Sequence, residues 1–500
     1  MADNENPLAN FRFDKLPTEL LVGIFHHARI RGVSNARRTK HPYPVALSQV
    51  CRHWRNVALG APTLWTDIRI VQYDTKEIGE APHVYLERSK TCPIFLTWLS
   101  NPEQPDIQEV INNLIIPGAE RWQRITLITG NDEAADTLLI AMKSLDFPIL
   151  QDVEISRTPL ELSPSNPAFC HNAPLLRRCR FRGVPSFPPL PSSLVVLDYV
   201  PSALRFAEFD LDPLLEFLPH VAHSLEYLRF GLPPVPKVQF TPRTSKIPLE
   251  HLKSLLIKDS HVIMDHIFTP SLTYLGVFYL PEADTTDAAK MFEGFSAPIL
   301  RSIQFRKVPL LPILTIHHFP SMFPQLESIT LSGCTDESSF AHLLGQPKPK
   351  TPSSLQKASK YPFPNLKELT ISDMTIWTSL QAAIEKRLNN GEKSLRRIRL
   401  PKEETTGGIL SHLRRWLPTQ GIELVLYERG ELSMSTPEFQ DDFCEEEANL
   451  FLEIMERFEW EGYDEDDDYE YWDERDMFPL DYDDYDYEEE EEDEADFYEG

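Results

Sequence analysis

The chain has 500 residues, of which 41% are hydrophobic, enough for a large core and typical of two to four domains. Its net charge of −28 is concentrated between Glu438 and Gly500, where 32 acidic residues face two basic ones, so the remainder is close to neutral. No apolar run is long enough to cross a membrane, and the first residues lack the apolar core of a signal peptide.

Residues 1–10 are expected to be disordered, and a helical domain is predicted over residues 11–70. Two hydrophobic motifs define that domain: LPTELLVGIF at residues 16–25, and LSQVCRHWRNVA at 47–58, closed by APTLW at 61–65. Pro17 suits the first turn of a helix, and Leu20, Leu21, Ile24 and Phe25 follow at helical spacing. Helices this short cannot bury their apolar stripes alone, so leftover apolar surface would form a binding patch.

This pair of motifs resembles an F-box, in the form common among fungal F-box proteins. The resemblance implies a short helical bundle that docks on the Skp-type adaptor of a cullin-RING (SCF) ubiquitin ligase. It also implies which positions make or shape the docking surface: Leu16, Pro17, Leu20, Ile24, Phe25, Val50, Cys51 and Trp54. The sequence departs from the family in a basic, proline-bearing insert at residues 29–44, which could move the helices apart and weaken adaptor binding.

A phrase of three apolar residues, spaced as apolar-x-x-apolar-x-apolar, recurs along the middle of the chain. Its eleven copies begin at Trp122, Leu150, Leu176, Leu194, Leu225, Leu252, Leu272, Leu300, Leu326, Leu366 and Leu395. Several copies follow an X-Pro pair such as Phe147-Pro148, which is expected to set an extended entry to the repeat. Each copy would supply one short strand with alternate residues facing inward.

The phrase resembles the leucine-rich-repeat signature without its usual asparagine, and fungal F-box proteins commonly continue into degenerate repeats of this kind. The predicted fold class is therefore α/β: a helical F-box, then an irregular solenoid with parallel strands over residues 71–430. A helix followed by the first strand is expected within residues 83–100. Candidate recognition positions follow from repeat position alone: Lys253, Lys258, Thr273, Arg301, Gln304, Thr330, Lys367 and Thr370.

Residues 231–248 and 345–361 have the proline-rich, basic composition of surface loops. The tail, residues 431–500, is expected to be mostly disordered because its dense negative charges repel one another. One stretch of it, residues 449–458, has helical apolar spacing. The tail could repel nucleic acid, bind basic partners or shield the basic loops.

The sequence contains no P-loop, G-x-G-x-x-G, H-E-x-x-H or G-x-S-x-G motif, so no catalytic, cofactor-binding or metal-binding residues are predicted. The six cysteines form no C-x-x-C pair and are expected to be reduced, in a cytoplasmic or nuclear protein. The leading hypothesis is a non-catalytic substrate receptor of an SCF-type ligase, whose partners are the adaptor, the cullin-RING ligase and an unidentified target, without nucleic acid or membrane. The alternatives are a non-ligase repeat scaffold capped by the F-box-like segment, and a binder of basic proteins through the tail.

Overall fold

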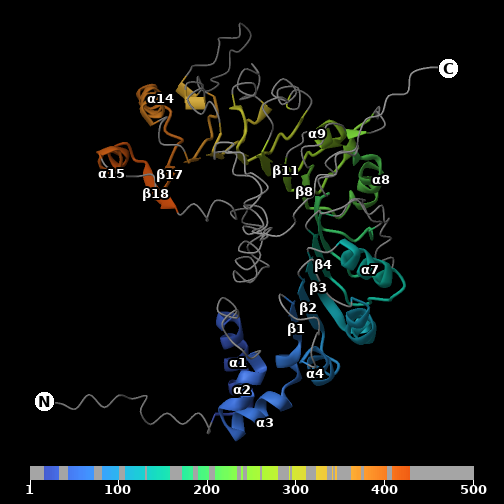
Figure 1. Ribbon diagram of the computed structural model, residues 1–500. Coiled ribbons are helices and arrows are strands. Elements are labelled where there is room, and N and C mark those ends of the chain that lie inside the picture. Colours follow the sequence, from blue (N-terminus) through green and yellow to red (C-terminus); the bar gives the residue numbers. More distant parts are fainter. Residues whose placement is uncertain are drawn as a thin grey trace, which may run out of the picture. The chain divides into compact units, whose positions relative to one another are not determined.

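The computed structural model describes most of the chain before residue 428 (Figure 1). The described residues are 16–32, 43–72, 81–100, 107–129, 132–157, 172–183, 190–201, 209–232, 238–239, 245–258, 262–279, 292, 295–310, 322–334, 340–341, 344–345, 362–372, 377–402 and 408–427. The chain divides between Glu446 and Glu447, and all described residues belong to the first part. The expected disordered N-terminus (1–10) and acidic tail (431–500) lie outside the described residues, as do residues 33–42 of the basic insert.

Three α-helices and a 3₁₀ turn form the N-terminal helical module, residues 16–66. They are α1 (Thr18–Gly32), α2 (Tyr43–Val50), α3 (Arg52–Gly60) and η3 (Pro62–Trp65). Helix α1 begins directly after Pro17, and Cys51 caps α3 by accepting a hydrogen bond at Sγ from the Trp54 N–H, at 3.4 Å. The two sequence motifs therefore form the helices expected of them.

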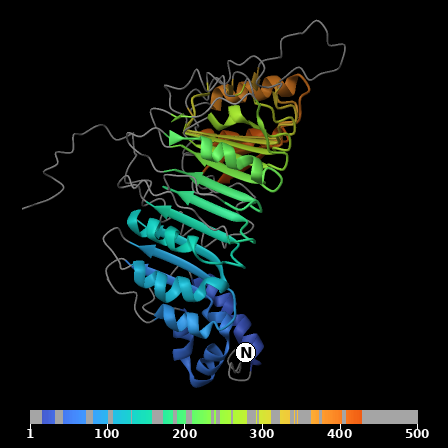
Figure 2. The ribbon, with the colours of Figure 1, turned by 90° about the vertical axis from the view of Figure 1, so that its right-hand side faces the viewer.

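A single parallel sheet of fourteen strands follows, and Figure 2 shows its strands running side by side. The strands, in spatial order, are β1 (Asp67–Gln72), β2 (Ile94–Ser100), β3 (Trp122–Thr129), β4 (Asp152–Arg157), β5 (Arg178–Arg182), β6 (Val196–Val200), β8 (Tyr227–Gly231), β11 (Ser254–Lys258), β13 (Tyr274–Phe278), β14 (Ser302–Arg306), β15 (Ser328–Ser332), β16 (Glu368–Ile371), β17 (Arg397–Pro401) and β18 (Glu423–Tyr427). Each strand pairs with the next along this order, so neighbours in sequence are neighbours in space. This arrangement confirms the predicted fold class of a helical region followed by a solenoid with parallel strands.

The return segments contain helices of varied length, and α7 and α8 lie on the same side of the sheet (Figure 1). They include α4 (Ala81–Arg88), α5 (Ile107–Val110), η4 (Ile111–Ile115), α6 (Ile116–Gly118), η5 (Ala119–Arg121), α7 (Asp132–Lys143), α8 (Asp212–Val221), α9 (Val262–His266), α14 (Trp377–Asn389) and α15 (Gly408–Thr419). Two minor parallel pairs join β7 (Phe209–Asp210) to β9 (Val238–Gln239) and β10 (Ile247–Pro248) to β12 (Ile267–Phe268). No helix among the described residues is long and apolar enough to span a bilayer.

The second and third apolar positions of the recurring phrase build the core, because they align in register along the sheet. For example, Ile125 is opposite Val153 and Leu127 is opposite Ile155, and all four side chains are buried. The same alignment continues to β17, where Ile398 and Leu400 are also buried. Stacking the repeats thus buries two continuous apolar rows that no single repeat could bury alone.

Two strands of the large sheet, β1 and β18, escaped the sequence analysis, and the sheet begins earlier than expected. Strand β1 starts at Asp67, inside the range assigned to the helical domain, so β2 is the second strand and not the first. Trp65-x-x-Ile68-x-Ile70 is in fact a further copy of the phrase. Strands β2 and β18 lack a large apolar residue at the first position of the phrase, so the search for the full phrase missed β18, and β2 was predicted only as the strand expected within residues 83–100.

The X-Pro pairs do not provide the extended entry that was predicted. Phe147-Pro148 begins a turn that is closed by a hydrogen bond from the Leu150 N–H to the Phe147 carbonyl, at 3.3 Å. Ala173, Ala297, Phe323 and Phe363 accept the equivalent bond in their own repeats. Proline favours the second position of such turns because its φ is already fixed near the required value. The pairs therefore redirect the chain into each strand by a tight turn.

Trp65 links the helical module to the sheet. Its side chain is fully buried, and its indole N–H donates to the Ala58 carbonyl of α3 at 2.8 Å. The ring also lies 5.0 Å from that of Tyr85 and carries the Arg88 guanidinium at 4.4 Å, both from α4. The last residue of the second motif is therefore shared by the core of the module and the first repeat.

Candidate functional site

Helix α1 divides the four apolar residues of the predicted stripe between the interior and the solvent. Leu21 and Phe25, one turn apart, are buried, whereas Leu20 and Ile24 are 57% and 42% exposed. Residues spaced by four share one side of a helix, so Leu20 and Ile24 form an exposed apolar pair beside the buried one. Large apolar side chains left in water at helical spacing are typical of a docking surface.

Two further exposed apolar side chains lie at or near the C-terminal ends of α2 and α3. Val50, the last residue of α2, is 60% exposed, and Leu59 near the end of α3 is 40% exposed. Cys51 between the two helices is also exposed. Leu59 was not predicted as a docking residue, although its apolar side chain next to the helix-ending Gly60 was visible in the sequence.

The other predicted positions lie beneath the exposed apolar residues or next to them. Phe25 is buried and its ring centroid lies 4.9 Å from that of the partly buried Trp54. Leu16 is partly buried against the core, while Pro17 is exposed. Of the eight predicted positions, Pro17, Leu20, Ile24, Val50 and Cys51 are thus exposed, and the aromatic pair shapes the helices that carry them.

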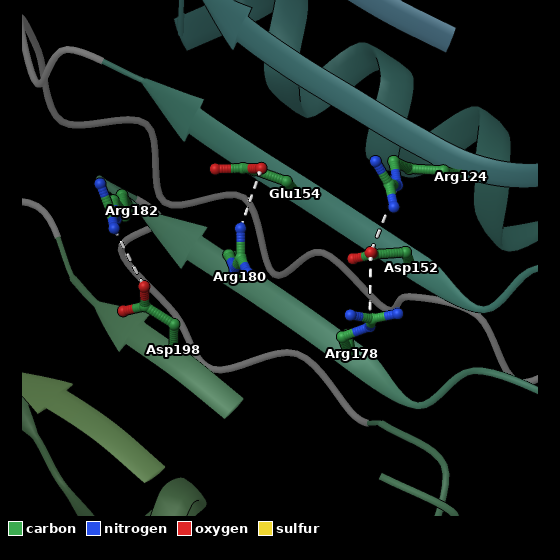
Figure 3. Close-up of polar contacts among 7 residues, drawn as sticks. All are labelled: Arg124, Asp152, Glu154, Arg178, Arg180, Arg182 and Asp198. Atoms are coloured by element: carbon green, nitrogen blue, oxygen red, sulfur yellow. Dashed lines mark hydrogen bonds and ion pairs between the residues drawn. The ribbon is translucent and has the colours of Figure 1, made fainter. Parts of the chain in front are cut away.

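A second candidate surface is the polar face of the sheet, which consists of the residues that alternate with the two core rows. One row of this face includes Glu154, Arg180, Asp198 and Arg229 on successive strands, in register. Figure 3 shows how charges of opposite sign meet between β3 and β6. The Asp152 carboxylate forms ion pairs with Arg124 and Arg178, at 3.3 and 3.5 Å.

Further pairs complete this charge network. Arg180 lies 3.6 Å from Glu154, and Asp198 lies 3.0 Å from Arg182 and 3.6 Å from Arg229. Five arginines and three carboxylates are involved, so arginines exceed carboxylates in the network. The sequence carried a signal for this network in the alternation Arg178-Cys179-Arg180-Phe181-Arg182, which the search for apolar positions passed over.

Burial and neighbouring charges act differently on two carboxyl groups of the network. Burial raises the pKa of Glu154 above its ordinary value, and the positive charges of Arg180 and Arg182 only partly oppose this. Burial alone would also raise the pKa of Asp198, but Arg229, Arg182 and Arg180 together lower it below its ordinary value. The Oε1 atom of Glu154 is buried without a hydrogen-bond partner among the described residues.

The eight recognition positions suggested by repeat position fall on two parts of the sheet. Lys258, Gln304, Thr330 and Thr370 lie on its polar face, although Gln304 and Thr370 are buried there. The other four precede their strands and form an edge, where Lys253 binds Glu226 at 2.7 Å and Lys367 binds Glu327 at 2.8 Å. The edge residues Thr273 and Arg301 are joined by a main-chain hydrogen bond of 2.9 Å.

The described residues contain no group of three or more His, Cys, Asp or Glu side chains placed to hold a metal ion. A comparison with curated proteins finds no match. Among solved structures, the crystal structure of the Rad7 and Elc1 complex in yeast is similar over 83% of this chain and 94% of that chain, at 14% identity and a TM-score of 0.27. A family model described as F-box-like matches residues 13–71. The chain therefore carries an F-box-like domain at residues 13–71.

Proposed function

We propose that this chain is the substrate-receptor subunit of an SCF-type cullin-RING ubiquitin ligase. Its F-box-like domain would bind a Skp-type adaptor, and the repeats would hold a target protein. The bond-forming chemistry belongs to other subunits, and this non-catalytic chain contributes proximity and orientation. The fungal family and the leucine-rich-repeat assignment of the solenoid are part of the same proposal.

One observation carries the adaptor role: the F-box-like domain leaves the apolar side chains of Leu20, Ile24 and Val50 about half exposed. About half of each side chain is exposed, so burying the exposed part in a partner is worth about 0.7–1.5 kcal/mol each, and the three together would contribute several times that of one. A domain whose only role were to cap the sheet would have no need to expose them, because Trp65 already provides the contact with the repeats.

The test is co-expression with a Skp-type adaptor, followed by size-exclusion chromatography. The wild type is expected to elute as a one-to-one complex, and a Leu20→Asp/Ile24→Asp variant is expected to lose the adaptor by about 100-fold or more in affinity. Both side chains are exposed, so the thermal unfolding of the variant should stay close to that of the wild type.

Ile140→Asp is the matched control, because Ile140 is 60% exposed on α7, outside the F-box-like domain. It makes the same chemical change and is expected to leave the adaptor complex intact. Undiminished adaptor binding by the α1 double variant would contradict the proposed docking surface. A wild type that forms no complex at micromolar concentrations would instead favour the non-ligase scaffold.

A further inference from the structure

Three cationic side chains surround one tyrosine where β11, β13 and β14 end. Lys258 and Arg306 are the last residues of β11 and β14, and Tyr279 and Lys307 directly follow β13 and β14. The Lys258 Nζ, Arg306 Cζ and Lys307 Nζ atoms lie 5.2, 5.6 and 5.5 Å from the centre of the Tyr279 ring. These four residues are called the Tyr279 cluster below.

Two cations of the Tyr279 cluster, Arg306 and Lys307, differ in their surroundings from the lysines at the opposite edge of the strands. Within the described part of the chain, no carboxylate lies within 4.0 Å of Arg306 or Lys307. By contrast, Lys253 and Lys367 at the opposite strand edge each bind a glutamate from the preceding repeat. Cations gathered on an aromatic ring repel one another, so a nearby negative group would be attracted to the cluster.

The backbone of the Tyr279 cluster is strained as well. Tyr279 and Lys307 have φ values of 56° and 49°, whereas glycine holds the corresponding place after β5 and β15, with φ values of 71° and 58° at Gly183 and Gly333. Main-chain hydrogen bonds fix the conformation, from the Tyr279 N–H to Arg306 and from the Lys307 N–H to Ser332, both at 2.8 Å. Side chains kept where glycine fits better are characteristic of functional sites.

We propose that the Tyr279 cluster binds an acidic stretch of a partner polypeptide, one rich in Asp and Glu. The cations come from two strands, Lys258 from β11 and the other two from the end of β14, and these strands are about 10 Å apart. Same-side carboxylates of an extended peptide are about 7 Å apart, so a run of them can meet several cations at once. This inference rests on the proposed function only where it identifies the partner as the target of the ligase. The peptide binding itself is measured in the absence of an adaptor.

The experiment uses the full chain and a fluorescent twelve-residue peptide in which six Glu alternate with Ser, followed by anisotropy. A peptide with Gln in place of Glu tests the need for charge, and a peptide with a single phosphoserine tests phosphate instead. The Arg306→Glu/Lys307→Glu variant is expected to bind the acidic peptide about tenfold more weakly or worse. The acidic tail is present in the wild type and in every variant, and any competition from it would weaken peptide binding most in the wild type, so it can only reduce the difference that is measured.

The matched control is Lys253→Glu/Lys367→Glu, which makes the same change of charge at the opposite edge of the sheet. Acidic-peptide affinity that survives in this control and falls in the cluster variant supports the proposal. Equal weakening in both variants would mean that only overall charge matters, and the site would be abandoned. The site is also overturned if the wild type fails to bind the acidic peptide, or binds only the phosphoserine peptide. An adaptor that fails to bind has no effect on these outcomes.

Discussion

Lys307 shows how a single residue can be held in a conformation that its own chemistry disfavours. Its left-handed φ costs a residue with a Cβ about 1–2 kcal/mol. Glycine would remove that strain but lose more backbone entropy on folding, by about 0.5–1 kcal/mol. Lys307→Gly is therefore expected to stabilise the protein by about 0.5–1 kcal/mol, measured by urea unfolding.

The reverse change is available one repeat further along. A Cβ at Gly333 would meet only an ordinary contact, 3.4 Å from Cγ of Lys307, so Gly333→Ala tests backbone strain with little steric clash. It should destabilise the protein by about 1 kcal/mol. If both substitutions destabilise, the left-handed conformation is not the source of strain at Lys307.

The sequence predicted the apolar stripe of α1, but not which of its residues would be exposed for docking. Helical spacing identified Leu20, Leu21, Ile24 and Phe25 as one stripe, and the structure confirms the helix. The spacing could not say which pair is buried, because adjacent positions lie only about 100° apart around a helix. That division depends on how α1 packs against α3, which no local pattern encodes.

Among the strands, the charge network predicts an unusual response to pH. Because the folded-state pKa of Glu154 is raised, this carboxyl group keeps its proton in the folded protein at pH values above 4.5, where it has lost the proton in the unfolded chain. This group therefore lowers stability as pH rises from 4.5 through its folded-state pKa. Glu154→Gln removes the effect, so the stability of the variant relative to wild type should rise across that window in urea unfolding.

Asp198 responds with the opposite sign, because its folded-state pKa is lowered from 3.8. Its ionised form stabilises the fold above pH 3.8, and that contribution is lost as pH falls towards the folded-state value. Asp198→Asn is expected to cost about 3–5 kcal/mol at neutral pH, since it breaks a buried ion pair. The cost should shrink in acid, and a cost independent of pH would contradict the assigned role of its charge.

The strands were the most predictable elements and their polar face the least. The recurring apolar phrase located eleven strands, because two residues of each short strand are buried in the core and must be apolar. Residues between those positions are not constrained in this way, so the ion pairs of Asp152, Glu154 and Asp198 depend on the register between repeats that are about 20–30 residues apart in the sequence. Only the assembled sheet brings them together.

At the scale of the whole molecule, stability should be local, because each repeat packs mainly on its neighbours. Trp65→Ala removes the side chain that α3 and α4 share with the first repeat, at a cost of about 3–5 kcal/mol. Hydrogen exchange measured by mass spectrometry should show faster exchange in α1–α3 and β1 and unchanged exchange in β15–β18.

Leu400→Ala in β17 is the matching control, because it truncates an equally buried side chain near the opposite end of the sheet. It should speed exchange in β16–β18 and leave the helical module protected. Uniformly faster exchange in either variant would mean that the molecule unfolds as one cooperative unit, contrary to the expectation from its topology.

The order of the strands has a mechanical consequence. In the large sheet, the main-chain hydrogen bonds between strands join each strand only to its neighbours in the strand order, and none of them joins distant repeats. Tension applied between the ends of the sheet would therefore pass through every strand pair in series, so the weakest pair would separate first and the others would follow one after another. An unfolding enzyme that pulls on one end could therefore unfold the sheet repeat by repeat at a low and steady force. The repeats at the other end would stay folded and bound to a partner.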